Sequence, residues 1–255
     1  MSNQADDKRF FCVDRVIPLA LDREARAIAL AENPANASNQ AASTAERLAL
    51  VKAKMWKPGR TLRCRFLEGD AAIQQAVQKY AAQWTEHANI RFDFGDDPRA
   101  EIRIAFSPGS AWSACGTDSL VDRYYPAHQP TMNLGPLDDH TAEDLFSHTV
   151  LHEFGHALGC IHEHQNPVDG VQWNERAVLH YFKGPPNYWD ESQIRFEVLE
   201  RYNQSELNGT SFDPESIMCR EFPKGLAYNF GAIPLNPELS AADIAFIKKA
   251  YPAQS

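Results

Sequence analysis

The 255-residue sequence lacks a long apolar run, an excess of positive charge and any Cys-x-x-Cys pair. No apolar stretch approaches the roughly 20 residues that a membrane-spanning helix needs, so we expect a globular protein with no membrane partner. Lysine and arginine number 25 against 34 aspartates and glutamates, a net charge of -9. This balance argues against nucleic acid as the main partner.

Cysteine is sparse, and its five positions are scattered along the chain: Cys12, Cys64, Cys115, Cys160 and Cys219. An odd number at such spacings predicts neither a thiolate zinc site nor a disulfide framework.

The only apolar stretch near the start, residues 16–20, is too short for the core of a signal peptide. We therefore expect a reducing compartment, with a cytoplasmic location or non-classical export.

Apolar residues make up 44% of the chain, enough to bury a sizeable core. The first 56 residues are rich in Ala, Asn, Gln and charge, and helices are expected at Leu19–Ala31 and Thr44–Met55. We expect residues 1–56 to form an N-terminal extension, either packed on the main domain or removed as a pro-segment. Residues 57–255 then form the main domain.

Short runs of alternating or β-branched residues predict strands at Thr61–Leu67, Ile90–Phe94, Glu101–Phe106 and Thr131–Leu134. Between the first two, Asp70 can cap a helix whose apolar side chains recur at helical spacing. This mixture of strands and helices predicts the α+β class.

Later helices are expected near 174–182 and 190–202. A last helix should run from Ser240, whose Ser-x-x-Asp243 pattern predicts a cap, to just before Pro252. The pattern Thr141-x-x-Asp144 predicts a side-chain cap for a helix that runs to Leu158, where Gly159 can end it.

The strongest chemical signal is the stretch His-Glu-Phe-Gly-His-Ala-Leu-Gly-Cys-Ile-His-Glu, residues 152–163. His152 and His156 lie four residues apart, so a helix places both rings on one face, where they can share one cation. Glu153 is next to the first ligand and can act as general base toward a metal-bound water. Three neutral imidazoles with an open position suit catalytic zinc.

His148 lies one turn before this pair, but eight residues of helix rise about 12 Å, too far for one ion to bind His148 and His156 together. Only the pair 152/156 has a Glu directly after its first member and a Gly three residues after its second. Beyond that Gly the chain can turn back and bring His162 to the metal, with His164 as the alternative third ligand. We expect His148 to be a solvated or partnered histidine.

The pattern H-E-x-x-H-x-x-G-x-x-H resembles the metzincin zinc signature. The glutamate that follows it, Glu163, resembles the residue that the astacin family carries at this position. Ser216-Ile217-Met218 resembles the family's Met-turn, and Gly109–Ser113 and His162–Pro167 are similar to bacterial members. The resemblance implies one zinc per chain, held by His152, His156 and His162, with Met218 beneath it.

The resemblance also implies a two-lobed fold. A mixed twisted sheet and the active-site helix form an upper lobe, about residues 57–162, and a largely irregular lower lobe covers about 163–255. A protein or peptide substrate would lie between the lobes and pair with an edge strand, for which Ser107–Cys115 is the candidate.

This sequence departs from the family after the Met-turn, where astacins carry a Tyr that can bind zinc and stabilise the oxyanion. Arg220 stands at this position. A guanidinium is no zinc ligand, but it can donate hydrogen bonds to a developing oxyanion, so Arg220 is a candidate oxyanion stabiliser. The alternative is a surface arginine turned away from the site.

These features predict a metalloendopeptidase that hydrolyses peptide bonds through a water activated by Glu153 and zinc. The alternative is a zinc-binding protein of the same fold that binds peptides but is catalytically impaired, which only Arg220 motivates. No other cofactor is indicated by the sequence.

Overall fold

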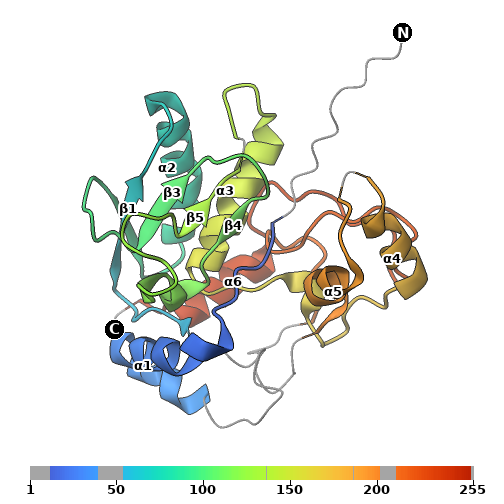
Figure 1. Cartoon of the computed structure of the whole chain (residues 1–255), viewed down its shortest axis with the longest axis horizontal. Helices are drawn as coiled ribbons and strands as arrows, with labels where there is room; N and C mark the ends of the chain where they lie inside the picture. The colour runs from blue at the N-terminus through green and yellow to red at the C-terminus, as the bar shows by residue number, and fades with distance from the viewer. Residues whose placement is uncertain (1–11, 40–53, 136, 186, 202–210, 254–255) are drawn as a thin grey trace.

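The computed structural model describes residues 12–39, 54–135, 137–185, 187–201 and 211–253. The expected helix at Thr44–Met55 lies almost wholly outside these residues. The described part contains helices, strands and short turns in an α+β arrangement, and the fold class predicted from the sequence is confirmed (Figure 1). No described helix is long and apolar enough to cross a membrane.

Five strands form a mixed sheet in the order β2-β1-β3-β5-β4. Their bounds are Thr61–Phe66 (β1), Arg91–Phe94 (β2), Ile102–Ala105 (β3), Trp112–Ser113 (β4) and Met132–Asn133 (β5). The first four in the spatial order pair in parallel, and β4 closes one edge antiparallel to β5. Within this sheet β4 pairs on one side only, and its other side lies against the N-terminal segment, where Val13 donates its main-chain N–H to the Ala111 carbonyl.

The helices are α1 (Asp22–Glu32), α2 (Ala71–Thr85), α3 (Glu143–Ala157), α4 (Glu175–Lys183), α5 (Glu191–Ile194) and α6 (Ala241–Ala250). Single 3-10 turns lie at Leu19–Leu21, Pro34–Asn39, Gly116–Leu120 and Glu163–Gln165, and a π turn at Arg195–Leu199 continues α5. The helix expected near 190–202 is therefore shorter than predicted and changes its hydrogen-bond pattern partway.

Helix caps follow the sequence at two of three expected places. The Asp70 carboxylate accepts from the main chain of Ala72 and Ile73, and Ser240 forms a full capping box with Asp243. The cap expected from Thr141 is wrong, because α3 begins after Ala142 with no side-chain cap. The Thr141 hydroxyl instead bonds the Asp138 carboxylate at 3.0 Å, a local turn that competes with capping.

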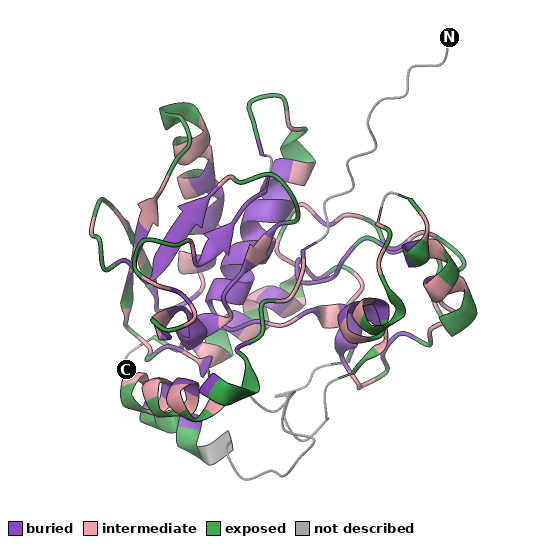
Figure 2. Ribbon diagram, viewed as in Figure 1, coloured by how far each residue is buried: buried purple, intermediate pink, exposed green. Residues whose placement is uncertain are grey.

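The main core lies between the sheet, α2 and α3 (Figure 2). It includes the fully buried rings of Trp56, Trp84 and Phe154. Tyr251, just after α6, joins the same cluster, so the last helix packs beneath α3. A second cluster around Val178, Phe182 and Phe222 forms the core of the part that carries α4 and α5.

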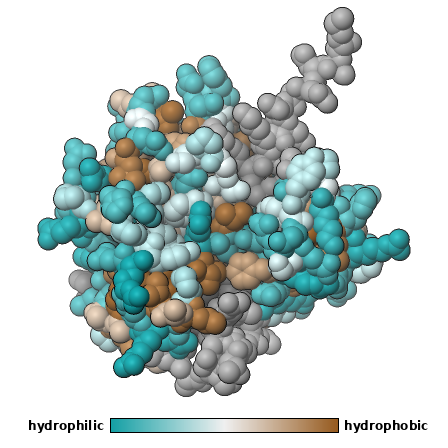
Figure 3. Space-filling view, in the orientation of Figure 1, coloured by the Kyte–Doolittle hydropathy of each residue, from teal (hydrophilic) through white to brown (hydrophobic). Residues whose placement is uncertain are grey.

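The N-terminal residues pack onto the main body at two places. Ile17, just before the first helical segment, and Leu21 and Ala25 within it share a cluster with Val121 and Tyr125. Before them, the stretch that begins at Cys12 runs between the sheet side and the α5 side of the molecule (Figure 1). The face seen in Figure 3 is largely hydrophilic, and its apolar atoms gather in separate patches.

Candidate active site

Helix α3 carries the two histidines of the motif through the centre of the molecule. Every residue from Phe146 to Ala157 is buried, and Trp84 of α2 donates its indole N–H to the Leu151 carbonyl at 2.9 Å. Gly155 gives the helix a bare side, since a Cβ there would lie 2.4 Å from the Met218 Sδ. Met218 therefore lies against the helix between the two histidine turns.

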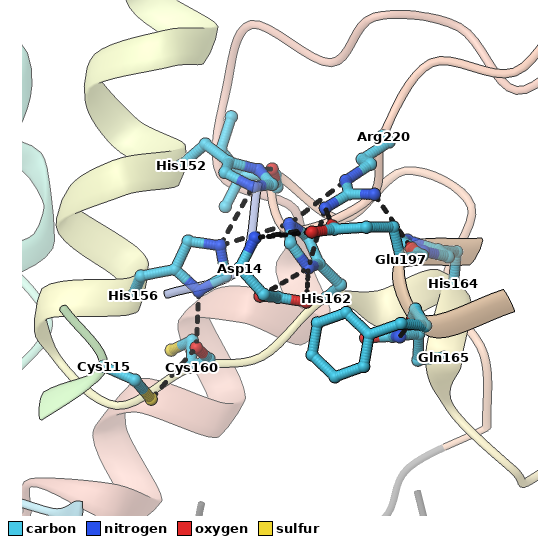
Figure 4. A network of polar contacts seen from close by, with 12 residues as sticks. Asp14, Cys115, His152, His156, Cys160, His162, His164, Gln165, Glu197 and Arg220 are labelled. Atoms are coloured by element: carbon cyan, nitrogen blue, oxygen red, sulfur yellow. Dashed lines mark hydrogen bonds and ion pairs between the residues drawn. The ribbon is translucent and has the colours of Figure 1, made fainter. Parts of the chain in front are cut away.

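The chain turns back directly after α3. Gly159 has φ +91°, a left-handed conformation that favours glycine, and the Cys160 N–H bonds back to the Gly155 carbonyl at 2.9 Å. This turn brings His162 to the other two rings. The Nε2 atom of His156 is 3.2 Å from the Nε2 atoms of both His152 and His162 (Figure 4).

The other ring nitrogen of each histidine has its own acceptor. The Nδ1 atoms of His152 and His156 lie 2.8 Å and 2.9 Å from the carbonyl oxygens of Ile217 and Cys160. The Nδ1 atom of His162 lies 3.2 Å from the Asp14 carboxylate. A proton on each Nδ1 leaves the lone pair on Nε2, so the three Nε2 atoms converge as acceptors.

This donor set fits a zinc ion. Three nitrogens about 2.0–2.1 Å from a tetrahedral zinc lie about 3.3 Å apart, close to the observed 3.2 Å. Burial lowers the pKa of all three imidazoles, which favours the neutral form that a metal ligand needs. Without a cation, no described residue would donate to the buried Nε2 acceptors of His152 and His156.

Cys12 completes the group. Its Sγ and one nitrogen from each of His152, His156 and His162 all lie within 4.8 Å of one another, and all four residues are buried. Cysteine thiolate is a common zinc ligand, so Cys12 can take the fourth position. Cys12 is therefore a candidate thiolate ligand that the cysteine spacing did not suggest. The ligand comes from 140 residues before His152, and no local spacing could reveal it.

Glu153 lies beside this group with an unusual lack of partners. Its side chain is 1% exposed, and no described residue donates a hydrogen bond of normal geometry to either carboxylate oxygen. Burial raises the pKa of Glu153 to about 8. A buried carboxyl that titrates near neutral pH can both accept and return a proton.

Arg220 lies inside the site and is 4% exposed, so it is not the surface arginine of the alternative reading. Its guanidinium forms an ion pair of 2.6 Å with the Glu197 carboxylate and donates to the Glu197 carbonyl oxygen at 2.8 Å. Its Nε atom is 3.3 Å from the Nε2 of His162. Burial opposes the charge, but Glu197 and Asp14 outweigh it and raise the pKa of Arg220.

Glu197 and Asp14 carry roles that the sequence did not reveal. The main-chain N–H of Asp14 donates to both Glu197 oxygens, at 3.2 Å and 3.4 Å. Asp14 thus joins His162, a candidate metal ligand, to the carboxylate that holds Arg220. Glu197 lies in a helical segment 35 residues after His162 with no motif around it, and no sequence signal pointed to it.

The two other histidines near the motif, His148 and His164, have structural partners. His148 is buried, with Nδ1 2.8 Å from the Asn236 carbonyl oxygen, and is absent from the four-residue group. His164 is buried as well, and its Nε2 atom is 3.0 Å from the Glu197 carbonyl oxygen. His162, rather than His164, is therefore the residue that the structure brings to the other two rings.

Glu163 pairs with internal donors, the Asn166 amide at 2.9 Å and the Asp213 N–H at 3.1 Å. Tyr228, the next tyrosine after the Met-turn, is 73% exposed.

Comparison with known proteins decides the family. A solved structure of myroilysin is 34% identical, covers 80% of this chain and 98% of its own, and superimposes with a TM-score of 0.76. The chain belongs to the astacin family of metzincin zinc metalloproteases. A crystal structure of myroilysin, also 34% identical, covers 78% of this chain and 86% of its own, with a TM-score of 0.60.

A more distant astacin-like structure is the hatching enzyme zinc-protease HCE-1 of the medaka fish Oryzias latipes. It is 17% identical, covers 79% of this chain and 96% of its own, and has a TM-score of 0.51, which shows a common fold. No family model matches the chain, and no curated protein matches it significantly. As an astacin-like metalloprotease, the chain is a hydrolase that acts on peptide bonds. Of the two functions that the sequence left open, the catalytically impaired binding protein is not favoured.

Proposed function

We propose that this astacin-like chain is a zinc endopeptidase that Cys12 holds in a latent state. The observation that carries the proposal is the convergence of three Nε2 atoms beside the unpartnered carboxylate of Glu153. The Nε2 of His156 lies 3.2 Å from each of the other two. His152, His156 and His162 would hold one zinc per chain. Bound zinc supplies a water of lowered pKa and draws electrons from a carbonyl oxygen.

The chain's own groups then divide the proton transfers. A Glu153 oxygen accepts a proton from the attacking water, and the carboxylic acid so formed donates it to the nitrogen of the leaving amine. Its burial keeps competing donors away, and its raised pKa suits both steps. Arg220 would donate hydrogen bonds to the developing oxyanion while Glu197 holds the guanidinium in place.

Latency follows from where the N-terminal segment lies. Cys12 fills the position that water and substrate need, and Val13 donates its main-chain N–H to the Ala111 carbonyl at 3.0 Å. A substrate peptide would need the same edge of β4. The segment must therefore leave, or be removed, before a peptide can enter.

The test compares Glu153→Gln with the unaltered residue in the full-length Cys12→Ala protein, in which the thiol no longer blocks the site. We expect bound zinc, measured by metal analysis, to stay at one per chain, while cleavage of a long unstructured protein falls by 10²–10⁴-fold. Glu143→Gln, on the exposed first turn of the same helix, is the matched control. Mass spectrometry of the products separates internal cleavage from removal of terminal residues, and equal cleavage with and without Glu153 would overturn the proposal.

A further inference from the structure

The segment that blocks the site lies along the open edge of β4 as a peptide would. Cys12 forms an isolated parallel bridge with Ala111, just before β4, and Arg15 forms one with Ala114, just after it. An extended chain advances about 3.3 Å per residue, so Arg15 lies about 10 Å along the edge from Cys12. This is the length of edge that a bound substrate would use on one side of its cleaved bond.

Arg15 makes one well-defined contact there. Its guanidinium carbon is 4.4 Å from the centroid of the Trp112 ring, within the range of a cation–π interaction. Tyr125 stacks with Trp112 at 22° between ring planes and a centroid distance of 6.3 Å, which holds the indole in place. Among the described residues, no carboxylate forms an ion pair with Arg15, so the ring is its main recognised partner.

The space around this contact is large enough for a side chain of this kind. A cavity of about 570 Å³ is lined by residues of the segment itself and of the fixed cleft wall, including Arg15, Trp112, Asn133, Gln193 and Glu197. Glu197 already accepts the main-chain N–H of Asp14 from the segment. The wall thus offers an aromatic face for a cation and a carboxylate for a peptide N–H.

We propose that Trp112 and Glu197 form a substrate subsite for a basic side chain, two to four residues from the cleaved bond, and that Arg15 fills this subsite in the latent chain. This inference rests on the proposed function, because it assigns the substrate of the same cleft. The indole would bind the cationic side chain, while Glu197 would accept a main-chain N–H of the same peptide. Removal of the segment would empty both positions together.

The test measures peptide binding without turnover. Full-length protein carrying Cys12→Ala, Arg15→Ala and Glu153→Gln is loaded with zinc and titrated with labelled peptides that differ only in arginine or its neutral isostere citrulline at one scanned position. We expect arginine to lower Kd about two- to fivefold at one position, the size of a cation–π contact at an exposed site. Trp112→Leu should bring the ratio to about one, whereas Tyr228→Leu, which alters an exposed aromatic residue, should keep it.

Equal Kd values for arginine and citrulline at every position would overturn the subsite, as would failure of both peptides to bind. The same peptides with Glu153 restored test turnover separately. A preference in binding without any cleavage would leave the subsite standing and overturn the proposed function. Cleavage without a preference for arginine would leave the proposed function standing and overturn the subsite.

Discussion

Asp243 holds Ile217 in place from the last helix, and Ile217 in turn orients His152, a proposed metal ligand. The Asp243 carboxylate accepts the main-chain N–H of Ile217 at 2.8 Å, and the carbonyl oxygen of Ile217 lies 2.8 Å from the Nδ1 of His152. The same carboxylate accepts from the Ser216 hydroxyl at 2.7 Å and from the Ser240 N–H at 2.9 Å. The capping box of α6 thus also fixes the turn that carries Met218.

Replacing Asp243 should therefore weaken both the fold and the metal site. Asn can offer one oxygen but turns an N–H₂ group toward a donor, which leaves a buried hydrogen bond unmade. We expect Asp243→Asn to lower the free energy of unfolding by about 1–3 kcal/mol and zinc affinity by roughly 10–100-fold. Urea unfolding and competition with a chelator measure the two effects.

The control is Asp70→Asn, the same substitution at the N-cap of α2, which has no link to the Met-turn. Asn caps a helix nearly as well as Asp, so both measurements should stay near the parent values. Unchanged zinc affinity in Asp243→Asn would contradict the coupling between α6 and His152.

The parts of this arrangement that sequence could predict are local. His152 and His156 share a helical face because of their spacing, and the positive φ at Gly159 produces the expected turn toward His162. The capping box at Ser240 likewise depends on neighbours three residues apart. Tertiary contacts were beyond reach. Asp14 meets His162 from 148 residues before it, and Cys12 joins the group from 150 residues before it. Glu197 holds Arg220 from 35 residues after His162, and no repeat or spacing relates these residues.

Removal of the Cys12 thiol should activate the full-length protein. Cys12→Ala takes away the one ligand that the N-terminal segment contributes to the four-residue group. The fraction of molecules whose N-terminal segment has left the site rises about tenfold for each 1.4 kcal/mol of binding free energy that the thiolate no longer contributes. We expect a higher initial rate of peptide cleavage in the zinc-loaded protein, measured with a quenched fluorescent substrate before any processing of the chain.

Cys64→Ala provides the control, because Cys64 is buried in β1 and lies outside the group. It should show the parent rate. If Cys12→Ala also shows the parent rate, while zinc is bound in both proteins, the thiol does not hold the enzyme latent.

Arg220 should affect turnover more than substrate affinity. In the Cys12→Ala protein, Arg220→Met removes the proposed oxyanion donor, and we expect kcat to fall about a hundredfold with little change in KM. The substitution also leaves the buried Glu197 carboxylate without its ion-pair partner, which costs about 3–5 kcal/mol of stability.

The double variant Arg220→Met/Glu197→Gln separates these effects. It removes the unpaired charge, so the free energy of unfolding should return toward the parent value while kcat stays low. Recovery of kcat together with stability would mean that Arg220 acts only by supporting the fold.

His148 should make the metal-free protein sensitive to acid. Burial lowers the pKa of this imidazole from 6.5 to about 4, so between these values the unfolded chain binds a proton that the folded chain does not. Stability therefore falls as pH drops from about 6.5 toward 4, and the loss from this one residue between pH 7.5 and pH 5 is about 2 kcal/mol. His148→Gln keeps a donor for the Asn236 carbonyl but cannot take up the proton.

Urea unfolding at the two pH values should show a loss of stability that is smaller by about 2 kcal/mol in His148→Gln than in the parent. The control is His140→Gln, at an exposed position before α3, which should follow the parent curve. Identical pH dependence in His148→Gln and the parent would show that His148 is not a source of the acid sensitivity.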